Sequence, residues 1–108
     1  MKMIMAIIRP EKLQHVKDAL KEIGVNALTI TDVRGRGQQS GLTFTNRVGT
    51  FVVDELEKTK IEVVVEDDEE EKTIKAIREA ATTGHMGDGR IFVMPVEMSI
   101  RIRDGSNE

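Results

Sequence analysis

The sequence predicts an α+β fold of the ferredoxin-like, split βαβ-βαβ type: a four-stranded antiparallel sheet with two helices on one face. Two observations predict it. The chain has 108 residues, the size of one domain, here residues 1–108. Its hydrophobic patterns run strand, helix, strand twice, separated by a long aperiodic segment. The strand-like runs are also too apolar for one sheet face to stay in water, so we expect that face to pack against copies of the same chain.

The first βαβ unit begins with an apolar run at residues 3–8 that predicts a buried strand. Pro10 suits the first turn of a helix. The apolar residues of that helix recur at helical spacing and form one stripe: Leu13, Val16, Leu20 and Ile23. Gly24 is expected to end the helix, and the loose alternation of residues 27–33 predicts the second strand.

The second unit repeats this order. Residues 60–66 predict a strand, and the five acidic residues 67–71 are expected to stabilise the N-terminus of a helix rather than to bind a cation. The inward side of that helix carries Ile74, Ile77, Ala80 and Ala81, and we expect it to end at Gly84. Residues 90–98 predict the fourth strand, residues 99–103 alternate cleanly, and residues 104–108 form a polar tail.

Composition excludes several classes of protein. The 16 basic and 19 acidic residues give a net charge of −3, so nothing draws the whole molecule to nucleic acid. The absence of cysteine excludes disulfides and thiolate sites. No apolar run approaches the roughly 18 residues of a membrane span, and no signal-peptide layout opens the chain. We therefore expect a cytoplasmic protein with no direct membrane insertion.

The segment 82–90 carries three glycines in six residues and must be a loop between helix and strand. Successive glycines let backbone N–H groups point into one concavity, and Arg90 adds a cation at its edge, which suits a phosphate. The alternative is a plain helix cap followed by a tight turn. A second glycine cluster at residues 35–41 and the arginines Arg101 and Arg103 favour the anion site.

The aperiodic stretch from about residue 40 to 59 is unusually long for a compact domain, which is typical of a functional loop. We expect residues 37–57 to contact a partner, with Arg47 as the anchor, although a loop arginine is often merely solvated. The loop is rooted in residues 35–41 at one end and near Lys58 at the other. A ligand bound at those roots would change the conformation of the loop, as in a switch.

Over nearly its whole length the chain resembles the PII nitrogen-regulatory signal proteins. The matching residues are Ile7-Ile8-Arg9-Pro10, Gly35-x-Gly37-x-Gln39-x-Gly41, Asp54, Lys58, Thr83-Gly84-x-x-Gly87-Asp88-Gly89-Arg90-Ile91-Phe92-Val93 and Ile100-Arg101-Ile102-Arg103. The stretches 9–12 and 35–37 look like those of archaeal or nitrogen-fixation-type members.

The resemblance implies a homotrimer that holds ATP or ADP in each cleft between subunits. The nucleotide-binding residues would be Thr29, Gly37, Gln38, Glu62, Val64, Gly87, Asp88, Gly89, Arg90, Arg101 and Arg103, the last two from the neighbouring chain. The effector 2-oxoglutarate would contact Gln39, Ser40, Gly41, Lys58 and Gly87, with Gln39 as a ligand of Mg²⁺ and Arg9 as a weaker neighbour. The partner would be an ammonium transporter, which would recruit the protein to the membrane, or a nitrogen-metabolism enzyme.

The chain departs from the family at the modification sites. It has no tyrosine, Phe51 and Gly49 stand where relatives carry modified residues, and Gln38 replaces a common arginine. Control is therefore expected to rest on ligands alone. Two alternatives remain: a related trimeric protein of a metal- or bicarbonate-linked branch, and an enzyme that uses the nucleotide. Against the enzyme, the sequence has no lysine-containing phosphate-loop motif and no nucleophile–base pair.

Overall fold

The computed structural model describes residues 1–36, 42–46, 49–53 and 55–107, with 42–46 and 49–53 described by their backbone alone. The strands are β1 (Lys2–Ile8), β2 (Thr29–Gly35), β3 (Leu42–Asn46), β4 (Gly49–Val53), β5 (Leu56–Val65) and β6 (Gly89–Pro95). The helices are α1 (Leu13–Glu22) and α2 (Glu70–Ala81). Each helix follows a short 3-10 turn, Pro10–Lys12 before α1 and Asp67–Glu69 before α2.

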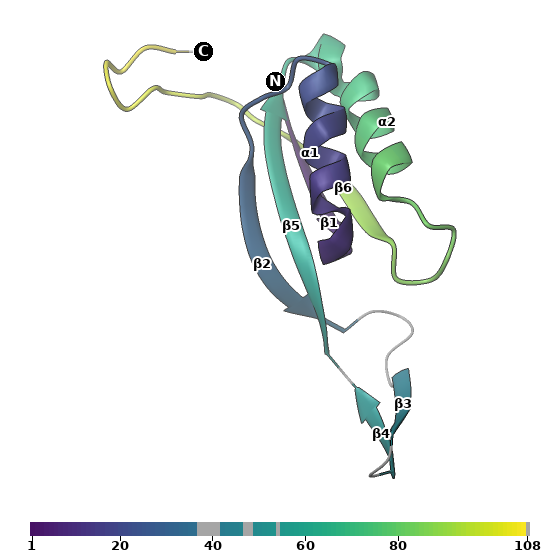
Figure 1. Ribbon diagram of the computed structural model, residues 1–108. Helices are drawn as coiled ribbons and strands as arrows, with labels where there is room; N and C mark the ends of the chain where they lie inside the picture. The colour runs from purple at the N-terminus through teal and green to yellow at the C-terminus, as the bar shows by residue number, and fades with distance from the viewer. Residues whose placement is uncertain (37–41, 47–48, 54, 108) are drawn as a thin grey trace.

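Four strands form one antiparallel sheet in the order β2-β5-β1-β6. The two central strands, β1 and β5, each begin one βαβ unit, so the two units interlock. Both helices lie side by side on one face of this sheet (Figure 1). The predicted ferredoxin-like fold is confirmed.

The core lies between the sheet and the helices and is aliphatic. Strand β1 buries every second residue, Ile4, Ala6 and Ile8, on the helix side. The matching residues of the neighbouring elements complete this core: Val16, Leu20, Ile61, Val63, Val65, Ile77 and Ala81. The period of two in the strands and of about 3.6 in the helices therefore places one apolar face of each element in a common interior.

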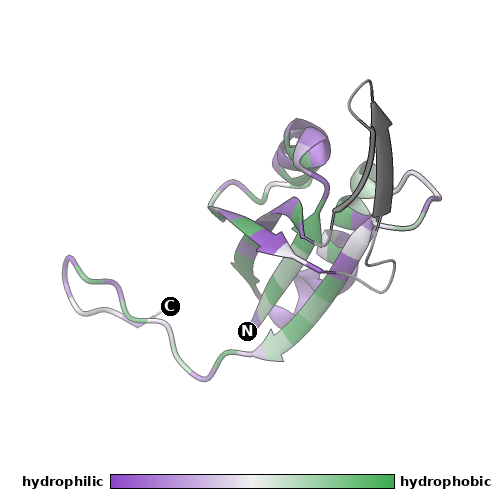
Figure 2. Cartoon of the chain, turned by 90° about the horizontal axis from the view of Figure 1, so that it is seen from below, coloured by the Kyte–Doolittle hydropathy of each residue, from purple (hydrophilic) through white to green (hydrophobic). Residues whose placement is uncertain are grey.

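No helix of the described residues covers the opposite face of the sheet. Met3 lies opposite Val64 and Met94 there, and Met5 lies opposite Phe92 in the next row. Val64 and Phe92 keep 46% and 45% of their surface exposed. Figure 2 shows hydrophobic bands along the strands of the sheet. Both the strands and the helices also carry hydrophilic bands. We call this surface the open face.

Several predicted boundaries are wrong. Strand β2 lies two residues later than the predicted 27–33, and β5 begins at Leu56, within the expected loop. The described part of that loop contains the antiparallel pair β3–β4, in register from Leu42–Val53 to Asn46–Gly49. Helix α2 ends at Ala81, three residues before Gly84. The backbone N–H groups of Thr83 and Gly84 bond to Asp88 in the following loop instead of continuing the helix.

The prediction for the C-terminal segment is also wrong. Strand β6 ends at Pro95 instead of residue 98, and the alternating residues 99–103 form no strand. They belong to an arm, residues 96–107, that runs away from the sheet (Figure 1). Within it the described backbone makes one isolated bridge, Ile100–Asn107. Alternation predicts a strand only where a neighbouring strand is available for pairing, and this arm has left the sheet.

Gly89, the first residue of β6, approaches β1 so closely that we expect it to tolerate no side chain. Its φ is +108°, and an added Cβ would lie 1.7 Å from the carbonyl oxygen of Ile7. Gly89→Ala should therefore lower the free energy of unfolding by more than about 2 kcal/mol in urea denaturation. Gly35→Ala is the control, because a Cβ there meets no atom of the described residues within 4 Å, and its effect should stay near about 0.5 kcal/mol. Equal losses in both variants would contradict this account.

Candidate functional site

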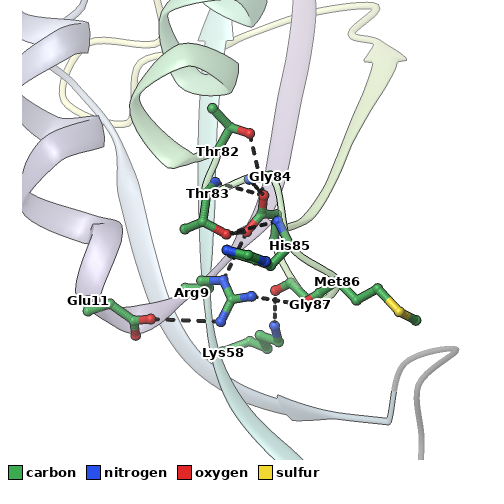
Figure 3. Close-up of polar contacts among 10 residues, drawn as sticks. Arg9, Glu11, Lys58, Thr82, Thr83, Gly84, His85, Met86 and Gly87 are labelled. Atoms are coloured by element: carbon green, nitrogen blue, oxygen red, sulfur yellow. Dashed lines mark hydrogen bonds and ion pairs between the residues drawn. The ribbon is translucent and has the colours of Figure 1, made fainter.

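The loop of residues 82–88, between α2 and β6, is closed by one carboxylate. Oxygen Oδ2 of Asp88 accepts hydrogen bonds from the backbone N–H groups of Thr83 at 2.8 Å and Gly84 at 2.9 Å, and Oδ1 accepts one from the Thr83 hydroxyl. Figure 3 shows these bonds converging within the loop. The Thr83 bonds are the main cause that holds the pKa of Asp88 far below its ordinary value, so it is ionised at neutral pH.

Arg9, just after β1, ties this loop to the sheet. Its Nε donates to Asp88 Oδ1 at 2.9 Å, and its Nη2 donates to the carbonyl oxygen of Met86 at 2.7 Å (Figure 3). Lys58, on β5, donates from Nζ to the carbonyl oxygen of Gly87. Burial and the nearby guanidinium of Arg9 lower the pKa of Lys58. Two cations, one from β5 and one from the end of β1, therefore fix consecutive carbonyl groups of the loop.

A cavity of about 510 Å³ lies beside the loop on the open face. It is lined by Ile7, Gly35, Arg36, Leu56, Lys58, Met86, Gly87, Gly89, Arg90 and Phe92. The walls are mostly apolar, while Arg36, Lys58 and Arg90 supply positive charge. This combination of apolar walls and a few charged groups is typical of a site for a small anionic ligand with an apolar part.

The structure brings together four of the predicted site residues at this cavity: Lys58, Gly87, Gly89 and Arg90. Thr29, Glu62 and Val64 lie on the same open face, with Thr29 directly opposite Glu62, but they do not line the cavity. Asp88 does not line the cavity, and its carboxylate accepts hydrogen bonds from the loop and from Arg9.

Other predicted residues lie elsewhere. Arg101 and Arg103 are on the C-terminal arm, which runs away from the sheet (Figure 1), and neither residue lines this cavity. Gly37, Gln38, Gln39, Ser40, Gly41 and Arg47 lie outside the described residues. Among the residues that are described, no group of three or more His, Asp or Glu side chains lies close enough to hold a metal ion, and no helix is long and apolar enough to cross a membrane.

Sequence reasoning missed the apolar walls of the cavity and the structural part played by Asp88. From the residues themselves, Ile7 and Phe92 were visible as members of apolar runs. Alternation along β1 and β6 predicts which side of the sheet they occupy, but it does not predict which residues of other elements line the cavity with them. The spacing of Asp88 from Thr83 and Gly84 was a usable signal, because a short acidic side chain four or five residues on can cap free backbone N–H groups.

Comparison with known proteins gives one family. A family model described as Nitrogen regulatory protein P-II matches residues 1–106. The chain is 53% identical over 105 residues to the Nitrogen regulatory protein P-II of Azospirillum brasilense, covering 97% of this chain and 94% of the relative. It is 52% identical to that of Rhodospirillum rubrum with the same coverage, and 48% identical over 107 residues to Nitrogen regulatory protein P-II 2 of Methanothermobacter thermautotrophicus, covering 99% and 93%.

We expect Asp88→Asn to destabilise the chain in a pH-dependent way. Because the folded-state pKa of Asp88 is lowered, its stabilisation is complete above the ordinary value of about 4 and is lost as the pH falls through the folded-state pKa. The difference in free energy of unfolding between wild type and variant should therefore be largest at pH 7 and shrink below about pH 4. Urea titrations from pH 7 to acid pH measure it. Glu79→Gln, at an exposed site on α2, is the control; a difference for Asp88→Asn that does not change with pH would refute the assignment.

Proposed function

The chain belongs to the nitrogen regulatory protein P-II family, and on that premise we propose that this signal protein is a non-catalytic sensor of ATP or ADP and of 2-oxoglutarate. The observation that carries the proposal is the cationic cavity of about 510 Å³ beside the 82–88 loop. Bound ligands would decide whether the loop of residues 37–57 engages a partner. As a sensor of metabolites the protein would work in the cytoplasm.

The cavity fits a nucleotide in its chemistry. Gly87 and Gly89, with φ of +95° and +108°, present backbone to the cavity without a side chain in the way. Arg90 adds a guanidinium that can pair with phosphate oxygens. Thr29 and Val64, further along the same face, would line the adenine and ribose, with Glu62 nearby, and the apolar walls at Ile7 and Phe92 would extend that surface. In this proposal the carboxylate of Asp88 shapes the loop, and its backbone would lie beside the phosphates with those of Gly87 and Gly89.

A homotrimer would complete the site. The open face carries the half-exposed apolar side chains of Val64 and Phe92, which a neighbouring copy would bury. The C-terminal arm exposes Met98 at 61% and Ile102 at 101%, an apolar side with no cover from the described part of its own chain. If the arm lies on a neighbouring copy, Arg101 and Arg103 reach a phosphate held by that copy. A phosphate shared by two chains makes the site depend on assembly.

The effector would bind where the loop roots meet. Lys58 already makes a charged hydrogen bond to the 82–88 loop, with Arg9 beside it, so a dicarboxylate could replace a backbone carbonyl as the partner of Lys58. Gln39 would supply a protein ligand to Mg²⁺, and the ion would add positive charge where the phosphates and the keto acid are proposed to bind. Ser40 and Gly41 would line the same place. A ligand there restrains the start of the loop and so biases its conformation.

Calorimetric titration with ATP, ADP and 2-oxoglutarate tests the proposal. We expect each nucleotide to bind alone and 2-oxoglutarate to bind with ATP and Mg²⁺. By linkage, ATP and 2-oxoglutarate must each tighten the binding of the other by the same factor. A chain that is monomeric in sedimentation and takes up no adenine nucleotide would rule out the sensor.

Gln39→Ala should separate the two ligands. Removing the side-chain oxygen takes away a protein ligand of Mg²⁺, so binding of 2-oxoglutarate should fall below detection while ADP affinity stays within about twofold. Calorimetry with and without Mg²⁺ measures both. Gln14→Ala, on the exposed side of α1, is the control for loss of an amide. Retained, Mg²⁺-dependent binding of 2-oxoglutarate would remove Gln39 from the site.

Arg47→Ala should weaken the contact with the partner. The proposed partner is an ammonium transporter or a nitrogen-metabolism enzyme, and a single arginine that enters a partner's pore or carbonyl ring typically carries a large share of the binding energy. We expect capture of that partner from cell extract to fall at least about tenfold, with nucleotide affinity unchanged. Arg34→Ala, on β2, is the matched control. Equal capture by both variants would end the anchor hypothesis.

A further inference from the structure

The tip of the C-terminal arm is a closed turn with a defined shape. The backbone N–H of Gly105 donates to the carbonyl oxygen of Arg101 at 2.7 Å, and the N–H of Arg101 donates to that of Ser106 at 2.9 Å. The bridge between Ile100 and Asn107 closes the base of this turn. The turn therefore keeps Arg101, Arg103 and the residue that follows them close to one another.

Asp104 lies between the two arginines at this tip. Its Oδ2 is 3.6 Å from Nη1 of Arg101 and 3.9 Å from Nη2 of Arg103. Its Oδ1 accepts the N–H of Ser106 at 3.0 Å, which fixes the carboxylate in place. Mainly because of Ser106, the pKa of Asp104 is lowered, so the group carries its charge at neutral pH. One anionic oxygen thus faces both guanidinium groups at once.

We propose that Asp104 is an internal counter-ion that competes with the nucleotide phosphates for Arg101 and Arg103 and lowers the affinity of the site. The inference rests on the proposed function, in which these arginines reach a phosphate bound by a neighbouring copy. A carboxylate oxygen and a phosphate oxygen make the same kind of charged hydrogen bond to a guanidinium group. A phosphate that takes the place between the arginines must displace the carboxylate or lie beside a like charge.

Competition outweighs preorganisation here because the ion pairs are long and exposed. The side chains of Arg101, Arg103 and Asp104 keep 42%, 77% and 46% of their surface exposed. At 3.9 Å, and with Arg103 77% exposed, the pair restricts the Arg103 rotamers little, so Asp104 does little to hold that arginine ready for a ligand. Its negative charge, in contrast, acts on every anion that approaches.

The test compares Asp104→Asn with Glu97→Gln by calorimetric titration of the full chain with ATP and with ADP at one salt concentration. Asparagine keeps an oxygen that can accept the Ser106 N–H, so the turn is retained while the charge is lost. Glu97→Gln removes the same charge from an exposed site on the same arm. We expect Asp104→Asn to bind nucleotide about twofold to tenfold tighter, and Glu97→Gln to change affinity less.

Two further measurements separate competition from a change of shape. The gain from Asp104→Asn should shrink as KCl rises from about 50 to about 500 mM, because salt screens exposed charges. It should also shrink in an Arg103→Gln background, since the two residues would be coupled. Nucleotide binding that Asp104→Asn leaves unchanged or weakens would overturn this inference alone. No nucleotide binding by the unsubstituted chain would overturn the proposed function and this inference with it.

Discussion

The site depends on one carboxylate that the loop folds around. Asp88 collects the N–H groups of the residues that follow helix α2, and Arg9 connects that carboxylate to the end of β1. Because Arg9 also holds the Met86 carbonyl and Lys58 holds that of Gly87, three charged side chains set the path of the glycine loop. These contacts shape one wall of the cavity beside the loop.

The two faces of the sheet have different roles. On the helix side the alternate residues of β1 and β5 are buried in an aliphatic core that needs nothing outside the chain. On the open face the remaining residues of the same strands form both the cavity and an apolar surface that stays half exposed. Ile7 thus lines the cavity while Ile8 belongs to the core, although they are consecutive in sequence.

Much of the fold was predictable because each element carries its own periodicity: the helical stripe ending at Ile23 and the apolar run of β1 needed no tertiary information. The cations Lys58 and Arg90 and the glycines of the loop were also visible as residue types that suit an anion. The capping of Thr83 and Gly84 by Asp88 was missed although their spacing signals it, whereas the bond from Arg9 to Asp88 joins residues 79 apart and leaves no local signal. The arm at residues 99–103 was misjudged because alternation is a property of side chains, whereas a strand needs a backbone neighbour.

The strand order has a consequence for how the chain is made. Strand β1 is synthesised first but lies between β5 and β6, so Ile8 finds its neighbours only at Thr59 and Gly89. At roughly 5–20 residues per second the nascent chain waits several seconds before its central strand can be enclosed. During that time the apolar residues of β1 have no sheet to join. Such distant pairings slow folding, so early shielding of this segment by a chaperone or by α1 would favour productive synthesis.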